Sequence, residues 1–491
     1  MKFVEQRDPA GNHTSLTPTR KSLVITVSST IFTLLCFPGP VMGQSLFEDA
    51  IGGSVEEETA GIGGHLGPLS YELNGYVRGA LWVGRVPDES DDEEAEVKAG
   101  YGEVSLKLRL RKGADGDGFA EFRISEGVAD GEEETDLDLR EAYINLYAGP
   151  FDIRFGHQII VWGRADGINP TNNLTPYDRR VRSPDEDDYR LANFGLRAWY
   201  NIDDFRVEGV WMPTYAESHF PEFSLDGPIE LGTPDYPGNG LSGGLGALRL
   251  NYEGPGFDAS LSYLYGYAPF PGVEFRDLSI YLLKPPVIRL GMKAYRHHVI
   301  GFDFSTTMME RYGLRGEAAF RRPLGYEGRE YIPDPDLQYV LGVDREFAGG
   351  DVMVIAQYIG RTTLDWEAIT NPGLLDNGIR AWTPMSEIIC LVRDEVALAN
   401  RMINGQLEEV SHSAMTRVEW KLLQETLSLE LLGVYNFTTE ELLLRPKVSY
   451  DIVDALEVVA GAELLTGPDG TLYGMIERSQ SAAYIQVKAS F

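Results

Sequence analysis

Alternation of apolar and polar residues with a period of two constrains this chain more than any other feature of its sequence. From Val104 to Arg111, one face of an extended segment is wholly aliphatic and the other is polar or basic. The same alternation recurs from Thr416 to Leu422 and from Leu427 to Leu431. Successive side chains of a β-strand point to opposite faces. The pattern therefore predicts many strands that separate an apolar from a polar environment.

About 18 such segments follow one another, with 16 as the alternative count, and an even number is typical of antiparallel barrels in bacterial outer membranes. The sequence thus predicts an all-β, up-and-down transmembrane barrel. The predicted strands span 71–86, 96–111, 117–127, 138–148, 150–163, 190–202, 204–214, 243–253, 256–268, 291–305, 309–321, 337–348, 350–361, 411–423, 426–437, 440–451, 453–465 and 481–491.

The connections between these segments alternate in length. Short ones, such as 148–150 and 253–256, are rich in Gly, Pro and Asp, whereas 163–189, 214–242 and 362–410 are long. Short periplasmic turns and long extracellular loops produce this alternation in outer-membrane barrels. The connection near Thr438 is short where a long one is expected.

The charge of the chain excludes one class of partner. Lys and Arg number 43 against 75 Asp and Glu, so the formal net charge is −32, which argues against binding of a nucleic-acid phosphate backbone. The acidic excess is concentrated in predicted loops, among them 88–94 and Glu132–Glu134. We interpret these clusters as solvated, with divalent-cation binding as the alternative.

The N-terminal residues predict export. Arg20 and Lys21 precede an apolar run over 23–37 and small residues near Gly43, the pattern of a signal peptide rather than of a membrane anchor. We predict a signal peptide over 1–43, a periplasmic N-terminal segment over 44–69 and the barrel over 70–491. Cys390 is then the one cysteine of the mature chain, and we expect it to pack as a small apolar residue.

The last residues form one apolar face that ends in Phe491. This ending resembles the C-terminal assembly signal of outer-membrane barrels, which implies the barrel assembly machinery as a partner. A barrel of this kind implies three further partners: outer-membrane lipid, lipopolysaccharide and a hydrophilic solute. Nucleic acid is not expected as a partner. Homo-oligomerisation stays open.

A barrel of this size is too wide for side chains to fill, so its interior should hold water. Polar residues on the strands then face the lumen. The predicted pore-lining residues are Lys107, Arg109, Arg111, Arg154, Gln158, Arg197, Arg206, Glu208, Arg315, Glu317, Arg417 and Glu419.

Two long loops are candidates for more than connection. The first, near 163–182, would constrict the pore if it folded inward; an ordinary extracellular loop is the alternative. Its candidate residues are Trp162, Arg164, Asp166, Asp178, Arg179 and Arg180. In the second, 362–410, apolar residues recur at helical spacing around Val392 and Val396, which predicts an amphipathic helix that either plugs the lumen or caps the rim.

The stretch from Arg140 to Tyr143, Gly156 to Gln158, Trp162-Gly163 and Asn169-Pro170 resembles the alginate-export-like and related porin-like barrels of Gram-negative bacteria. The resemblance implies a substrate-conducting role. An alginate exporter is expected to have a strongly basic conduit. The three glutamates among the predicted lumen arginines depart from that expectation: Glu208, Glu317 and Glu419.

Enzymatic readings have little support in the sequence. It contains no zinc-ligand spacing, phosphate loop, dinucleotide fingerprint or nucleophile elbow. Glu217, Ser218 and His219 are adjacent, but adjacency alone does not make a triad. The sequence predicts no catalytic residue, metal or cofactor. It predicts an outer-membrane channel for small hydrophilic, anionic or mixed-charge solutes. The alternatives are a barrel sheath for a partner such as a multihaem cytochrome and, third, a barrel-embedded hydrolase.

Overall fold

Eighteen antiparallel strands form one closed barrel. The computed structural model describes residues 62–66, 69–85, 95–129, 131–219, 229–238, 240–241, 243–279, 287–309, 311–369 and 384–491. Closure joins the first and last barrel strands, with Tyr76 opposite Ser490 and Gly84 opposite Ala482. The barrel strands are β2 (Leu69–Arg85), β3 (Ala95–Lys112), β4 (Gly116–Ala129), β5 (Glu132–Ala148), β6 (Phe151–Gln158), β7 (Asn193–Ile202), β8 (Phe205–Met212), β10 (Leu245–Gly254), β11 (Phe257–Tyr267), β14 (Arg296–Met308), β15 (Tyr312–Pro323), β16 (Asp336–Phe347), β17 (Val352–Thr363), β18 (Val410–Leu422), β19 (Leu427–Asn436), β20 (Glu441–Val453), β21 (Leu456–Thr466) and β22 (Ala482–Ser490).

The predicted fold is confirmed, and each predicted strand overlaps one barrel strand. Three boundaries were wrong by five residues or more. Strand β14 begins at Arg296 rather than at 291, because Val287–Lys293 form a strand of a separate sheet. Strand β5 begins at Glu132, so Glu132–Glu134 lie in a strand and not in a loop. Strand β6 ends at Gln158, five residues before the predicted end. There the backbone N–H of Ile159 donates to the Glu141 carboxylate (2.7 Å) instead of continuing the sheet.

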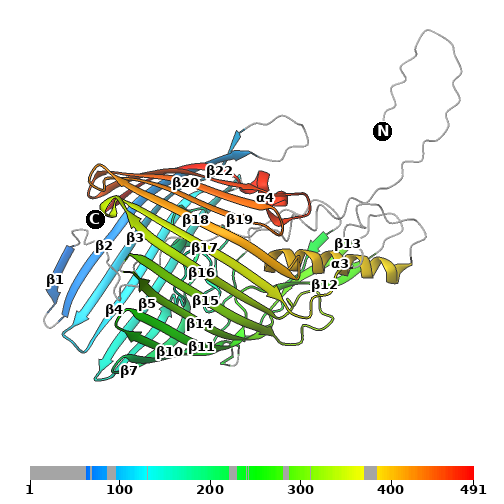
Figure 1. Cartoon of the computed structure of the whole chain (residues 1–491), viewed down its shortest axis with the longest axis horizontal. Helices are drawn as coiled ribbons and strands as arrows, with labels where there is room; N and C mark the ends of the chain where they lie inside the picture. The colour runs from blue at the N-terminus through cyan, green and yellow to red at the C-terminus, as the bar shows by residue number, and fades with distance from the viewer. Residues whose placement is uncertain are drawn as a thin grey trace, which may run out of the picture.

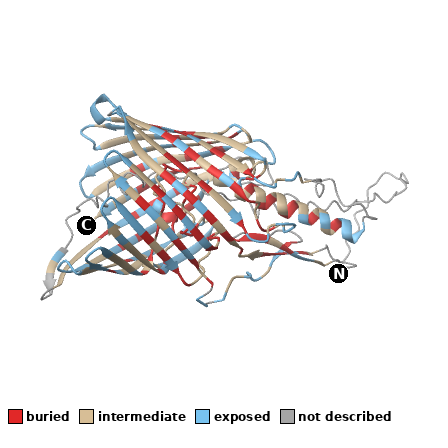
Figure 2. Cartoon of the chain, turned by 60° about the horizontal axis from the view of Figure 1, so that its bottom comes forward, coloured by how far each residue is buried: buried red, intermediate tan, exposed pale blue. Residues whose placement is uncertain are grey.

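The two faces of the barrel wall differ in polarity. On β14, the outward-facing Ile300 and Phe302 are 49% and 45% exposed, whereas Val299 and Asp303, which flank this pair on the inner face, are buried. Exposed and buried positions alternate in this way along most strands (Figure 2). A closed sheet leaves no unpaired edge, and an apolar exterior suits hydrocarbon. Within the described residues, no α-helix has both the length and the apolar character needed to cross a bilayer.

The two ends of the barrel differ in their connections (Figure 1). At the end that carries the C-terminus, hereafter the short-turn end, each turn between barrel strands has two to four residues. At the opposite, long-loop end lie the connections 159–192, 213–244, 268–295 and 364–409. The predicted alternation of short and long connections is confirmed for these loops, and the short connection over 437–440 is present as predicted. Strands β4 and β5 are an additional exception, since only two residues separate them at this end.

A small apolar unit covers part of the long-loop end. It consists of the sheet β9 (Ile229–Leu231), β12 (Gly272–Ser279) and β13 (Val287–Lys293), the helix α3 (Met385–Asn404) and the shorter α4 (Leu472–Gln480). The predicted amphipathic helix is therefore present, and its buried side includes Val392 and Val396. Gly405 ends it in the left-handed region (φ 63°) that favours glycine. Cys390 is exposed on α3, so its predicted packing role was wrong.

The predicted signal peptide, 1–43, lies outside the described residues. Within the predicted N-terminal segment the structure describes β1 (Ile62–Leu66), which pairs antiparallel with the beginning of β2. At the other terminus, the backbone groups of Phe491 exchange two hydrogen bonds with Gly75, both 2.9 Å. The terminal residue thus extends the seam that closes the barrel.

Candidate functional site

The connection 159–192, hereafter the lumen loop, forms polar contacts with inward-facing residues of many strands. On one side it contacts β14 and β15. The Arg164 side chain donates to the Asp303 carboxylate (Nε–Oδ1, 2.8 Å). The buried Glu317 carboxylate accepts from the backbone N–H groups of Arg164 and Ala165, and from the Thr171 hydroxyl (2.9 Å). The loop is therefore attached to this wall through both side chains and backbone.

The same loop is attached to distant strands through Asp188, which lies in a short 3-10 turn, η1 (Glu186–Tyr189). Its two carboxylate oxygens lie 2.5 Å from nitrogens of Arg78 on β2 and Arg123 on β4. Glu186 of the same turn pairs with Arg445 on β20 (3.0 Å). Strands β14 and β15 are separated from β2 by many strands on either path around the barrel, so the loop bridges the lumen.

The charges around Asp188 are buried and balanced. Burial by itself would raise the pKa of the Asp188 carboxyl, but the guanidinium groups of Arg78 and Arg123 outweigh that effect and hold the pKa well below its usual range. Arg78 also pairs with Glu103 (3.0 Å). Removing one partner of such a buried network leaves an uncompensated charge, which is strongly destabilising.

Two further residues predicted for constriction contact the wall. The indole N–H of Trp162 donates to Glu208 on β8 (3.0 Å). Asp166 pairs with Arg417 on β18 (3.4 Å), which also pairs with Glu430 on β19 (2.7 Å). Burial raises the pKa of Asp166, and the attraction of Arg417 offsets that only in part.

The remaining three predicted constriction residues join the lumen loop to other loops. Asp178 binds Arg180 (2.6 Å) and the imidazole of His219 (3.0 Å). These hydrogen bonds hold the pKa of Asp178 below its usual range despite its burial, which acts to raise it. The guanidinium of Arg179 lies over the rings of Tyr177 (4.8 Å) and Phe270 (5.7 Å).

The predicted pore-lining residues divide into two groups. Those buried at the level of the lumen loop are Gln158, Glu208, Glu317 and Arg417, which are 0%, 2%, 3% and 7% exposed. Their polar atoms serve the loop and its neighbours, as with the Gln158 amide that donates to the Gly195 carbonyl (3.0 Å).

The second group lies toward the short-turn end. Arg154 stands opposite Arg197 in the sheet register and lies over the Tyr143 ring (3.9 Å). Arg197 pairs with Glu208 (2.7 Å). The basic residues on the inner face of β3, β6, β7 and β8, hereafter the basic stripe, are Lys107, Arg109, Arg111, Arg154, Arg197 and Arg206. On the opposite wall Arg315 pairs with Asp344 (3.2 Å), and Glu419 accepts from the Ser428 hydroxyl (3.2 Å).

Sequence reasoning missed Asp188 and its partners Arg78 and Arg123. The alternation of faces places both arginines inward. No local pattern, however, tells which loop residue would reach them across 65 and 110 positions of the chain. Such pairs form only when the loop folds back into the lumen against earlier strands.

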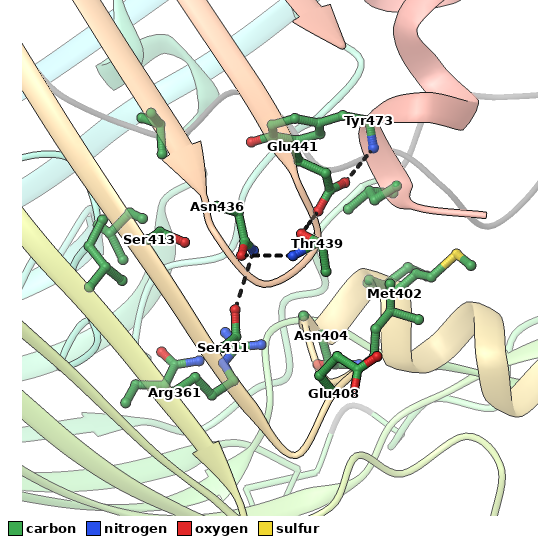
Figure 3. A pocket seen from close by; sticks show the side chains of 18 of the residues that line it. Arg361, Met402, Asn404, Glu408, Ser411, Ser413, Asn436, Thr439, Glu441 and Tyr473 are labelled. Carbon is green, nitrogen blue, oxygen red and sulfur yellow. Dashed lines mark hydrogen bonds between the residues drawn. The ribbon is translucent and has the colours of Figure 1, made fainter. Parts of the chain in front are cut away.

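A cavity of about 260 Å³ lies beside the lumen loop (Figure 3). Its walls come from Ile168 and Pro170 of that loop, the end of α3, the beginning of α4 and strands β16 to β20. On one side the Glu441 carboxylate accepts from the backbone N–H of Tyr473 (2.7 Å). The cavity therefore belongs to the contact between the lumen loop and the two helices.

The residues considered for catalysis form loop contacts. Ser218 accepts from the backbone N–H of Tyr177 (3.0 Å), and His219 contacts Asp178. In the part of the chain that the structure describes, no three His, Cys, Asp or Glu side chains are grouped so that they could hold a metal ion.

No protein-family model matches the sequence, and no curated protein is significantly similar to it. Several solved structures are similar to it at low sequence identity. OccK5 (OpdH) of Pseudomonas aeruginosa and OccAB4 of Acinetobacter baumannii each have 10% identity and a TM-score of 0.47, over 86% of this chain and 97% of theirs. OmpF of Salmonella typhi, in complex with daunomycin, has 11% identity and a TM-score of 0.41, over 88% of this chain and 100% of its own.

The strand pairing and the two faces of the wall decide the class of this protein without these likenesses. The chain is a transmembrane β-barrel of the outer-membrane type. It closes with no free edge, exposes apolar side chains outward and encloses charged ones. The finer resemblance to alginate-export-like families stays a prediction, since no family model matches.

Proposed function

We propose that the barrel is a water-filled channel for small hydrophilic solutes and that the lumen loop is its constriction. The observation that carries this proposal is the set of contacts from one loop to inward-facing residues on opposite walls, through Arg164 to Asp303 and through Asp188 to Arg78 and Arg123. A segment held in this way narrows the path without closing the barrel, as filter and constriction elements do in other channels.

We propose further that the channel prefers anions or solutes of mixed charge. The basic stripe supports this preference, because six cationic side chains share one side of the wall. The acidic groups among them, such as Glu208 beside Arg197, keep the preference weak. Charged rings and patches in a narrow aqueous path act on ions through the same electrostatics as in any pore.

The alternative of a barrel sheath around a partner protein has less support. A partner inside the barrel would have to displace the lumen loop and expose the buried charges of Asp188, Glu186 and Glu317. The alternative of a barrel-embedded hydrolase has equally little support, since the side chains of Ser218 and His219 are used in contacts between loops. We therefore propose the channel, with no catalytic role.

Conductance in planar bilayers tests the proposal. Reversal potentials measured under a KCl gradient should show a weak anion preference in the wild type, and Arg154→Ala should reduce it because it removes a charge of the basic stripe. Arg164→Ala should alter the conductance itself because it frees the lumen loop from Asp303. Arg311→Ala, an exposed residue of the short-turn end, is the matched control and should change neither.

Folded protein that is heat-modifiable on gels but never conducts would contradict the channel. Unchanged selectivity in Arg154→Ala would contradict the role of the basic stripe and leave the channel intact.

A further inference from the structure

Two arginines and a histidine interrupt the apolar outer face of the barrel at the long-loop end. Arg296 is the first residue of β14, and His298 follows on the same outward face, above the exposed Ile300 and Phe302. Arg322 lies on β15 directly opposite His298 in the sheet register and is exposed. Charges on the lipid-facing side of a barrel are costly at mid-membrane and cost little near the interface, so this cluster belongs at headgroup level.

Tyrosines hold two of the three basic side chains in place. The Arg296 guanidinium donates to the Tyr265 hydroxyl (3.3 Å) and lies over the Tyr267 ring (4.7 Å). The His298 ring is stacked on Tyr265 (4.7 Å between centroids), and its Nδ1 lies 2.8 Å from the Tyr263 hydroxyl. The cluster is therefore ordered before any ligand arrives, which lowers the entropic cost of binding.

A second outward-facing aromatic group lies in the part of the wall nearer the long-loop end. Tyr358 on β17 contacts His412 on β18 through its hydroxyl and through ring stacking (5.9 Å), and Tyr339 lies beside Tyr358 (6.2 Å). Girdles of aromatic residues are typical of the two membrane–water interfaces of such barrels. Arg296, His298 and Arg322, at the long-loop ends of β14 and β15, therefore lie where the headgroups of the outer leaflet are expected.

We propose that Arg296, His298 and Arg322, hereafter the rim site, bind the phosphate group of a phosphorylated glycolipid in the outer leaflet. The guanidinium groups supply charge-assisted donors that suit phosphate oxygens. The adjoining Ile300 and Phe302 supply an apolar surface for the acyl chains of the same lipid. Among the described residues, the acidic Glu327 and Asp365 lie beyond the strand ends, beside Tyr326. The rim site depends on the barrel fold alone and not on conduction.

The opposite rim provides a matched control. Arg345 on β16 faces outward at the short-turn end, donates to the Tyr312 hydroxyl (2.6 Å) and lies over the rings of Tyr312 (4.8 Å) and Phe347 (4.5 Å). Arg345 thus contacts aromatic rings and a tyrosine hydroxyl in the same way as Arg296. It faces the inner leaflet. The residue opposite it on β17 is Val354, so the paired histidine and arginine of His298 and Arg322 are not repeated there.

Native mass spectrometry of the full-length folded protein in a non-ionic detergent tests the rim site. The probes are bisphosphorylated lipid A, the same lipid without its phosphates, and inorganic phosphate, all in EDTA so that bridging cations do not contribute. Wild type should retain bisphosphorylated lipid A and bind the dephosphorylated lipid at least about tenfold more weakly, as loss of charge-assisted hydrogen bonds implies. Inorganic phosphate alone should not compete, because the acyl chains contribute to binding.

The double variant Arg296→Gln/Arg322→Gln should lose that tenfold preference, and His298→Gln should lose part of it. Arg345→Gln should bind as wild type does. Heat-modifiability on gels shows that each variant is folded. The proposal is overturned if the folded double variant binds bisphosphorylated lipid A as tightly as wild type, or if Arg345→Gln weakens binding equally.

Discussion

The two longest described connections at the long-loop end are held to the barrel by different forces. The lumen loop is attached by ion pairs and hydrogen bonds, above all those of Asp188, Arg164 and Glu317. Helix α3 is attached by apolar packing of Val392, Val396 and other residues against β12, β13 and the barrel wall. Polar contacts are added near its C-terminal end. The Asn400 side chain bonds to the N–H and carbonyl of Val273, and Arg401 pairs with Asp334 (3.3 Å) at the surface of the unit.

This difference has a physical consequence. Hydrogen-bonded charge pairs fix position and register, because each buried charge needs its own partner. Apolar packing does not require a specific partner for each side chain. When a buried apolar side chain is shortened, the loss of stability grows with the volume removed. Removing one charge should therefore cause a large loss of stability in the lumen loop, whereas removing one apolar side chain of α3 should cause a smaller loss.

The largest effect is expected for Asp188→Asn. Arg78 and Arg123 would remain buried without their carboxylate, so the free energy of unfolding should fall by about 3–5 kcal/mol. Denaturant titration of the protein in lipid vesicles measures this. Asp185→Asn is the control, since Asp185 is much more exposed and lies 3.8 Å from Arg78. Equal effects of the two substitutions would contradict the special role of Asp188.

A smaller, graded loss is expected for Val396→Ala, whose side chain is fully buried in the α3 core. The substitution removes apolar volume and should cost about 2 kcal/mol. Since no charge is involved, the loss should be the same at low and high salt. Cys390→Ser on the exposed side of α3 should be neutral in the same titration. A salt-dependent loss for Val396→Ala would show that the helix is not held by apolar packing.

Acidification should separate the two connections. The pKa values of Asp188 and Asp178 are lowered, so these groups stabilise the loop fully above the ordinary carboxyl pKa of about 3.9, and the contribution is lost as the pH falls through their lower values in the folded state. Protease cleavage within 159–192 should thus increase strongly below about pH 3. Cleavage near α3 should rise less. Parallel cleavage at both connections would contradict the distinction.

The smallest effect is expected for Asp166→Asn. Burial raises the pKa of Asp166, so its ionised form is disfavoured in the folded state and stability is lost as the pH rises from the ordinary carboxyl pKa through the raised value. At neutral pH the amide should therefore change stability by less than about 1 kcal/mol, because Arg417 keeps Glu430 as partner. Denaturant titration of Asp166→Asn and Asp188→Asn under the same conditions compares their free energies of unfolding. A larger loss for Asp166→Asn than for Asp188→Asn would contradict the prediction.

Period-two alternation was sufficient to predict the barrel because the membrane enforces it. Each outward position such as Ile300 must be apolar, and the pattern is local to the strand. The helical period around Val392 and Val396 predicted α3 for the same local reason. Boundaries failed where a tertiary contact ends a strand, as at Ile159 beside Glu141.

The candidate site could be predicted only in part. Arg164 and Asp166 stood out because charges are dense around them in the sequence. The attachment points of the loop on the wall did not stand out, since Asp188 meets Arg78 on β2 only when the loop after β6 folds back into the lumen. Ion pairs of that separation have no local signature, and the sequence therefore predicted a loop with charges but not its attachment points.

Single-channel conductance of a variant without the lumen loop tests the central claim most directly. Residues 165–188 would be replaced by a short Gly-Ser linker between β6 and β7, and refolding checked by heat-modifiability. If the lumen loop is the constriction, the conductance should rise about twofold or more over wild type and ion selectivity should weaken. A folded variant with the wild-type conductance and selectivity would contradict the claim.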